Sequence, residues 1–138
     1  MSDHGSTRRP DIVLLLTDQQ AASALACAGN PDVRTPGLDR LAAEGVRFES
    51  AYCTQPLCTP SRASLITGLM PHECGCSRNG ESILPALRPQ GFGRLLAAAG
   101  YECFYGGKWH VPQIALPGDN DHGFQSICGF NDAQLADA

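Results

Sequence analysis

The chain has 138 residues, which is enough for one domain with a buried core. Hydrophobic residues make up 43% of it and charged residues 17%, a composition typical of a folded globular protein and not of a disordered segment. The net charge of −4 and the lack of a basic run argue against nucleic acid or a membrane surface as a partner.

Seven cysteines are present, an odd number, and no secretion signal is visible in front of them. A disulfide framework is therefore not expected. The longest apolar run, residues 12–16, is far shorter than the ~20 residues that a bilayer requires. These features predict a cytoplasmic protein with reduced thiols.

The first half of the chain predicts a leader, a strand and two helices. Residues 1–10 are a flexible polar leader, and 11–138 are expected to fold. The unbroken apolar run DIVLLLTD at 11–18 predicts a strand buried on both faces. The Ala-rich segment 19–29 predicts a helix. A second helix is predicted over 35–45, with a Thr-Pro start and a Gly end.

The second half continues the alternation. Residues 46–52 and 101–107 predict strands, and a helix is predicted from the Thr-Pro pair at 59–60 to Gly68. Residues 68–80 read as a loop, and a further helix, FGRLLAAAG, lies within 89–100. This order predicts an α/β fold with a mostly parallel sheet flanked by helices.

Three polar clusters fall at or just beyond predicted strand ends, where sites of such folds lie. They are Asp18-Gln19, the segment 58–62, and the segment 108–110. In the second, Cys58 directly precedes a predicted helix start and Arg62 follows one turn later. A helix N-terminus attracts anions, and a guanidinium suits tetrahedral oxyanions, so this cluster predicts an oxyanion site.

Other interpretations of Cys58 remain open on spacing alone. It could be a buried structural thiol, which is the commonest state of a lone cysteine. A phosphatase thiolate would need five residues between the Cys and the Arg, and three are present. Zinc binding with Cys53 lacks a second ligand pair at finger-like spacing. His72, Cys74 and Cys76 are likewise expected to be a loop with thiols and not a zinc site.

The run C-T-P-S-R-A-S-L-I-T-G at 58–68 resembles the signature of the Cys-type sulfatases of the alkaline-phosphatase-like superfamily. RPDIVLLLTDQQ, TPGLDRLAAEGVRFESAY and GYECFYGGKWH resemble further segments of that family. The resemblance implies that Cys58 is oxidised to Cα-formylglycine, the catalytic residue. It also implies an alkaline-phosphatase-like fold, of which this chain holds the N-terminal portion.

The family match assigns roles to five more residues. Asp18 corresponds to a ligand of a divalent cation, and Gln19 stands where many sulfatases have a second Asp. The cation implied is Ca²⁺, with Mn²⁺ or Mg²⁺ as alternatives, and Cys58, once modified, would join its ligands. Lys108 and His110 correspond to a sulfate-binding Lys and to a His that contacts the formylglycine hydroxyl. Arg62, with Lys108, would offset the negative charge of the sulfate.

The implied reaction is hydrolysis of a sulfate ester, on a small molecule or a glycan. The hydrated aldehyde attacks sulfur, the alcohol leaves, and His110 assists the release of sulfate from the covalent intermediate. The implied partner is a formylglycine-generating enzyme or an anaerobic sulfatase-maturing enzyme. No nucleic acid or membrane partner is expected.

Two other functions remain open. Some relatives with an Asp-Gln pair act on phosphonate or phosphate diesters or on choline sulfate, so the scaffold could hydrolyse phosphonate or phosphate esters. The chain could also be a non-catalytic remnant, because the remaining metal ligands and the leaving-group acid of the family come from later segments. For the same reason we expect the 138-residue chain to be nearly inactive by itself.

Overall fold

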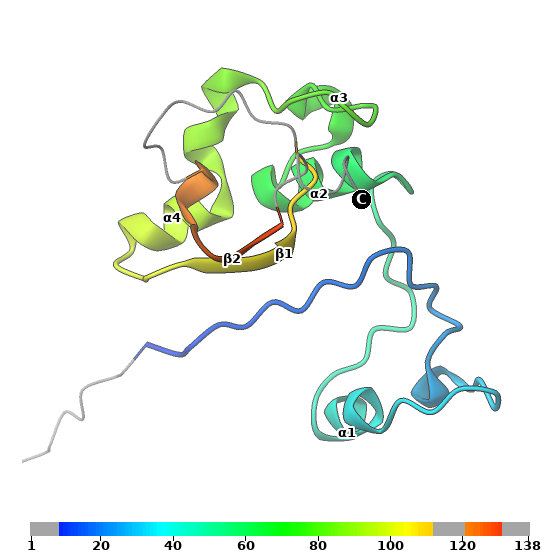
Figure 1. The fold of residues 1–138 in the computed structure, drawn as a ribbon. Helices are drawn as coiled ribbons and strands as arrows, with labels where there is room; N and C mark the ends of the chain where they lie inside the picture. Colours follow the sequence, from blue (N-terminus) through cyan, green and yellow to red (C-terminus); the bar gives the residue numbers. More distant parts are fainter. Residues whose placement is uncertain (1–8, 112–120, 131–138) are drawn as a thin grey trace, which may run out of the picture. The chain divides into compact units, whose positions relative to one another are not determined.

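A computed structural model describes residues 9–111 and 121–130 and divides the chain into two compact units, Met1–Glu49 and Ser50–Ala138 (Figure 1). Each unit is described by itself. The leader expected at 1–10 lies outside the described residues except for its last two positions. In the part of the chain that is described, no helix is long and apolar enough to cross a membrane.

The first unit is built around helix α1, Pro36–Glu44, and the short 3-10 helix η1, Ala26–Ala28. The prediction of a helix over 35–45 is confirmed. However, the Thr35 hydroxyl does not cap α1. It accepts the Ala26 N–H at 3.0 Å and donates to Asp39 at 2.9 Å, and thereby ties η1 to α1.

Three predictions for this half of the chain are wrong. Residues 11–18 and 46–52 form no strand, and of the helix expected over 19–29 only η1 exists. A strand needs a hydrogen-bonded neighbour, and in the part of the chain that the structure describes neither segment pairs with another strand. All five apolar side chains at 12–16 are accordingly exposed, by 53–81%. The helix fails at its start because Gln19 has a left-handed φ of 56°.

The second unit holds the helices α2 (Cys58–Thr67), α3 (Pro71–Cys74) and α4 (Phe92–Ala98), with the 3-10 helices η2 (Pro85–Gln90) and η3 (Asp121–Gly123). Strands β1 (Phe104–Lys108) and β2 (Gln125–Phe130) pair in parallel, from Phe104 opposite Gln125 to Lys108 opposite Phe130. In Figure 1 the helices of this unit lie on one side of the two strands.

These elements confirm the α/β class with a parallel sheet and helices. The strand expected at 101–107 is β1, and the helix expected within 89–100 is α4. Two details differ from the prediction. The segment expected to be a loop contains α3, which begins at Pro71, a residue suited to the first turn of a helix. Strand β2 was not predicted.

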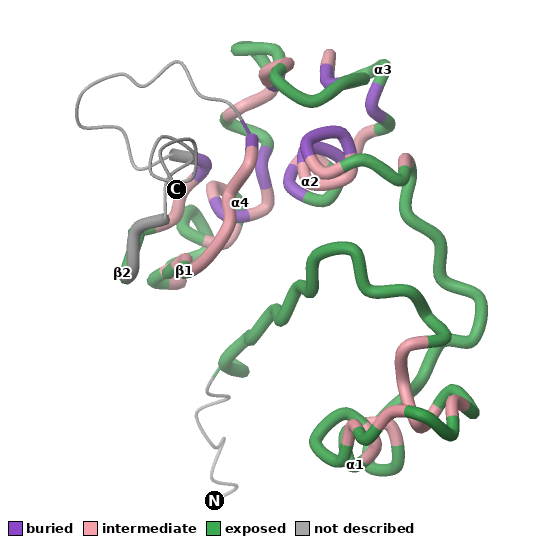
Figure 2. The backbone as a smooth tube through the Cα atoms, turned by 45° about the vertical axis from the view of Figure 1, so that its right-hand side comes forward, coloured by how far each residue is buried: buried purple, intermediate pink, exposed green. Residues whose placement is uncertain are grey.

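The core of the second unit surrounds α2, whose buried residues appear in purple in Figure 2. Ala63 and Ile66, one helical turn apart, face Cys74, Ile83 and Val111. Beside this cluster, Phe124 meets Phe92, Tyr105 and Trp109 edge-on, with ring centroids 5.2, 6.3 and 6.1 Å away. The aromatic group joins α4 to the strands.

Gly93 allows α4 to approach η3. A Cβ at this position would lie 2.3 Å from a Phe124 ring carbon and 2.4 Å from the His122 carbonyl oxygen, distances that real Cβ atoms do not show. We expect Gly93→Ala to lower the free energy of unfolding by about 1–3 kcal/mol through overpacking. Thermal and urea unfolding of the purified variant measure the change.

Gly37→Ala is the matched control, since Gly37 also lies within a helix. A Cβ there meets no atom of the described residues within 4 Å. This variant should be neutral or more stable by up to ~1 kcal/mol, because alanine is the better helix former. Equal losses in both variants would contradict the packing argument.

Candidate active site

Helix α2 presents Cys58 at its first position. Leu57 precedes the helix in an extended conformation, with φ −137° and ψ 143°, and Gly68 closes it with a left-handed φ of 73°. The predicted cap was Thr59 with Pro60 as the first helical residue, so the helix begins two residues earlier than predicted, and Thr59 is its second residue. Cys58 is therefore the first residue of the helix and is partly exposed, whereas the next residue, Thr59, is fully buried.

Two of the backbone donors at this helix start, the N–H groups of Thr59 and Ser61, are already used. The Thr59 N–H donates to the side-chain oxygen of Asn79 at 3.0 Å, and Pro60 has no N–H. The Ser61 N–H makes the first bond of the helix, to the Leu57 carbonyl at 3.0 Å. The expectation that backbone N–H groups bind the anion is corrected for Thr59 and Pro60. The charge for an anion must come mainly from side chains and the helix dipole.

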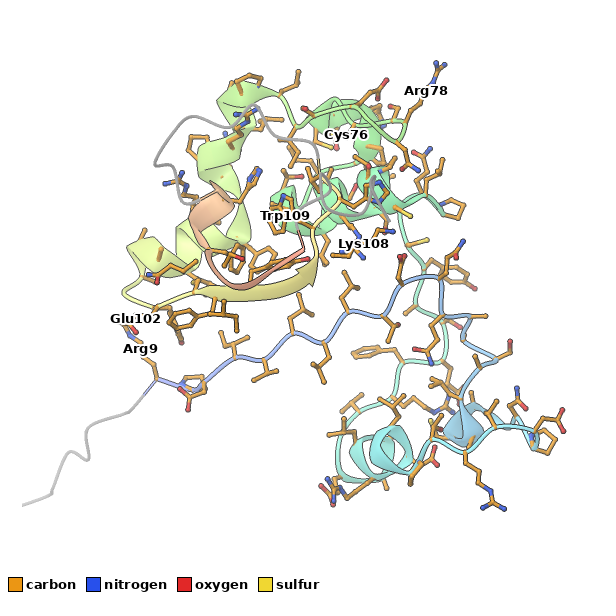
Figure 3. The ribbon with its side chains drawn as sticks, in the orientation of Figure 1. Arg9, Cys76, Arg78, Glu102, Lys108 and Trp109 are labelled. Atoms are coloured by element: carbon orange, nitrogen blue, oxygen red, sulfur yellow. The ribbon has the colours of Figure 1, made fainter. Side chains whose placement is uncertain are left out.

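Two cationic side chains meet at this end of α2. The Lys108 ammonium lies 3.7 Å from the Cys58 sulfur, and Figure 3 shows Lys108 at the end of β1 near this helix. Arg62, one turn after Cys58, donates to the Lys108 carbonyl at 2.5 Å. The Tyr105 hydroxyl donates to the same carbonyl. Because that carbonyl accepts both donors, the end of β1 is fixed against α2.

His110 lies in the segment that follows β1. Its backbone is left-handed, with φ 51°, and its carbonyl accepts the Thr59 hydroxyl at 2.9 Å. The Nδ1 atom of its ring is buried and has no hydrogen-bond partner in the described part of the chain. A buried polar atom of this kind calls for an explanation, and a bound substrate group is one.

Short contacts in the second unit join three of the six predicted site residues: Cys58, Arg62 and Lys108. His110 is linked through its carbonyl to Thr59, the residue next to Cys58, and the approach of its ring to Cys58 stays a prediction. Asp18 and Gln19 belong to the first unit, where Asp18 follows the extended segment and Gln19 has the left-handed backbone noted above. Each unit is described separately, so their expected approach to Cys58 stays a prediction. Among the described residues no group of three acidic, His or Cys side chains could hold a metal ion.

Two residues of the site were not assigned roles in it from the sequence. Thr59 was interpreted as a helix cap, and Tyr105 as an ordinary strand residue. Thr59 contacts a carbonyl 51 residues later in the chain, which local spacing does not reveal. Tyr105 contacts the carbonyl of Lys108, the last residue of its own strand, which a strand pattern alone does not indicate. Asn79, 21 residues after the cysteine, carried only a weak signal, because it falls near an Asn seen in the family that the sequence resembles.

Cys74 and Cys76 lie apart from this chemistry. Both are fully buried, and their sulfurs contact the carbonyls of Pro71 and Glu81 at 3.5 and 3.4 Å. Burial, with the neighbouring Cys74 and Glu81, raises the pKa of Cys76 to about 11. These thiols are part of the core, and no disulfide joins the six cysteines whose side chains the structure describes.

The fold and this cluster match one family. A family model described as Sulfatase matches residues 10–137, and the chain belongs to that family. An N-acetylglucosamine-6-O-sulfatase of Bacteroides thetaiotaomicron is 39% identical over 116 residues, which cover 84% of this chain and 20% of that protein. The chain thus spans about a fifth of the length of this relative.

Two solved structures are similar as well. One is BT4656 in complex with its substrate D-glucosamine-2-N,6-O-disulfate, with a TM-score of 0.70 and 34% identity over 77% of this chain and 21% of that one. The other is a phosphonate monoester hydrolase of Agrobacterium radiobacter, with a TM-score of 0.70 and 26% identity over 86% of this chain and 25% of that one. Both support the alkaline-phosphatase-like fold expected from the sequence.

The contact from Asn79 to Thr59 can be tested by stability. Asn79→Ala leaves the Thr59 amide without its acceptor, and we expect a loss of about 1–2 kcal/mol in the free energy of unfolding. Asn79→Asp keeps an acceptor oxygen and adds a charge that the helix dipole favours, so it should stay close to the unchanged protein. Urea unfolding at pH 7 measures both; an aspartate variant as unstable as the alanine variant would contradict this assignment.

The raised pKa of Cys76 predicts a pH dependence. The unfolded chain loses the thiol proton near pH 9, whereas the folded protein keeps it until about pH 11. Stability should therefore fall as the pH rises through that window, by on the order of 2 kcal/mol. Urea midpoints at pH 8 and 10.5 measure this fall in stability. The fall should be smaller in Cys76→Ala. It should be unchanged in the control Cys53→Ala, because Cys53 is exposed.

Proposed function

We propose that this chain carries the nucleophile side of a sulfuric ester hydrolase site, with Cys58 converted to formylglycine. The observation that carries the proposal is the 3.7 Å approach of the Lys108 ammonium to the Cys58 sulfur, at the start of the helix that bears the C-x-P-x-R motif. Residues 11–138 would then belong to the catalytic domain.

The side chains have complementary roles in this proposal. Arg62 and Lys108 offset the negative charge of a sulfate that reacts at position 58. Lys108 is a point charge beside the reacting residue, while Arg62 holds the Lys108 backbone and keeps the strand end in place. The His110 ring, with its buried Nδ1, would carry a proton to or from the reacting hydroxyl group. The aldehyde of formylglycine, when present, supplies a hydrate with two hydroxyl groups, one to attack and one to expel sulfate.

A divalent cation fits the donor chemistry of the first unit. Asp18 offers a carboxylate and Gln19 an amide oxygen, and hard cations such as Ca²⁺ accept both. We assign these two residues, with modified Cys58, as ligands of Ca²⁺, or of Mn²⁺ or Mg²⁺. The cation would act as a Lewis acid that polarises the reacting oxygen.

The substrate class follows from the relatives. One is named for a 6-O-sulfated aminosugar, and another was solved with a disulfated glucosamine. We therefore propose a sulfate ester of a sugar as substrate, and a formylglycine-generating or anaerobic sulfatase-maturing enzyme as a partner. Phosphonate monoester hydrolysis is the second candidate, favoured by the similar phosphonate hydrolase structure and by Gln19 in place of a second Asp.

Mass spectrometry and two substrates test the proposal. The protein is produced with a formylglycine-generating enzyme, and the peptide that contains Cys58 should be about 18 Da lighter than its thiol form. Turnover of an aryl sulfate is then compared with that of an aryl phosphonate monoester, with Ca²⁺ added.

Cys58→Ala should abolish turnover, and Lys108→Met should lower kcat by about 10²-fold, because a charge that stabilises the transition state is lost. An unmodified thiol in the competent host would contradict the assignment of Cys58. Faster turnover of the phosphonate than of the sulfate would favour the second candidate.

A further inference from the structure

Thr59 joins three separate segments of the second unit. Its N–H donates to Asn79 in the turn that follows α3, at 3.0 Å. Its hydroxyl donates to the carbonyl of His110 after β1, at 2.9 Å. The residue itself is the second residue of α2 and is fully buried. A hydroxyl so placed is shielded from water, so its bond to His110 is not exchanged for a bond to solvent.

The segment around His110 is held at a strained backbone angle. The φ of 51° lies in the left-handed region, which a residue with a side chain adopts only when its surroundings hold it there. Trp109, just before it, packs edge-on against Tyr105 with ring centroids 4.8 Å apart. Val111, just after it, is buried in the core. The Thr59 hydroxyl fixes the carbonyl between these two anchors.

The orientation of the His110 ring depends on this backbone. Its Nδ1 atom has no hydrogen-bond partner among the residues that the structure describes, so no described group orients the ring through that atom. The direction of the Cα–Cβ bond follows from the backbone angles. A change in those angles would move the ring relative to Lys108 and Cys58.

We propose that Thr59 is a positioning residue for His110, and that its hydroxyl keeps the imidazole aligned with the reacting residue. This inference rests on the proposed function, in which His110 moves a proton. Thr59 occupies the variable position of the C-x-P-x-R motif, so the modification signature does not explain a threonine there. The hydrogen bond from its hydroxyl to the His110 carbonyl gives Thr59 a role in orienting His110.

Thr59→Val and Thr59→Ser separate the hydroxyl from the shape of the side chain. Valine keeps the volume and loses the donor, whereas serine keeps the donor and loses a methyl group. Ser64→Ala is the matched control in the same helix. The Ser64 hydroxyl is also buried and has no hydrogen-bond partner in the described part of the chain, and Ser64 is another variable position of the signature.

The experiment compares kcat and KM for an aryl sulfate on Ca²⁺-loaded protein, normalised to the formylglycine content found by mass spectrometry and assayed well below each melting temperature. We expect Thr59→Val to lower kcat by about tenfold and leave KM within about twofold, because a misaligned proton-transfer group slows the reaction and not binding. Thr59→Ser should stay within about twofold of the unchanged protein in kcat, and Ser64→Ala should match it.

A crystal structure of Thr59→Val provides a second measurement that needs no activity. We expect His110 to leave its left-handed conformation in Thr59→Val and to keep it in Thr59→Ser. Unchanged kcat together with an unchanged His110 in Thr59→Val would overturn the inference. If the formylglycine-bearing chain shows no more than the near-absence of turnover expected of these 138 residues, the crystal structures alone decide whether Thr59 sets the His110 backbone. The proposed function is tested separately, because an unmodified Cys58 in the competent host contradicts it without bearing on the His110 backbone.

Discussion

The site depends on the attachment of the carboxyl end of β1 to the first turns of α2. One carbonyl, that of Lys108, accepts hydrogen bonds from Arg62 of the helix and from Tyr105 of the strand itself. A charged donor gives a stronger and more directional bond than a neutral one, so this contact fixes the strand end closely. The Lys108 side chain, on the same residue, is thereby brought to Cys58. Without this attachment, nothing in these contacts would hold the Lys108 ammonium close to the Cys58 sulfur.

The sequence indicated Cys58, Arg62, Lys108 and His110 as site residues because their motif and their places next to predicted elements are local features. The structure brings the first three together, and the catalytic roles of all four stay a prediction. The strands expected at 11–18 and 46–52 fail for a different reason. An apolar pattern states that a segment can be buried, but a strand also needs a partner to accept its backbone hydrogen bonds. That partner is not a property of the segment.

Strand β2 was missed for the converse reason. Its sequence, QSICGF, has neither a long apolar run nor a regular alternation, and a glycine weakens its strand propensity. It is a strand because it pairs with β1 in parallel, and Phe124, just before it, packs against Phe92 and Trp109. In the same way, Thr59 looked like a helix cap because Thr-Pro commonly begins helices. Its hydroxyl instead finds the His110 carbonyl, 51 residues later, and Asn79 supplies the acceptor at the helix start.

Cys76 and Cys58 belong to the same unit but have opposite surroundings. The contrast explains why only the position of Cys58 is suited to binding an anion. Cys76 is buried beside another thiol and the Glu81 carboxylate, which disfavour a negative charge and raise its pKa. Cys58 lies at the positive end of a helix, with the Lys108 ammonium at 3.7 Å and Arg62 one turn away. Such surroundings stabilise a negative charge on whatever group occupies that position, including a sulfate being transferred. Asn79 and Pro60 leave the helix with few backbone donors for an anion. In the proposed reaction the two cations would therefore supply most of this stabilisation, so the attachment of Lys108 to Arg62 would matter for the reaction as well as for the fold.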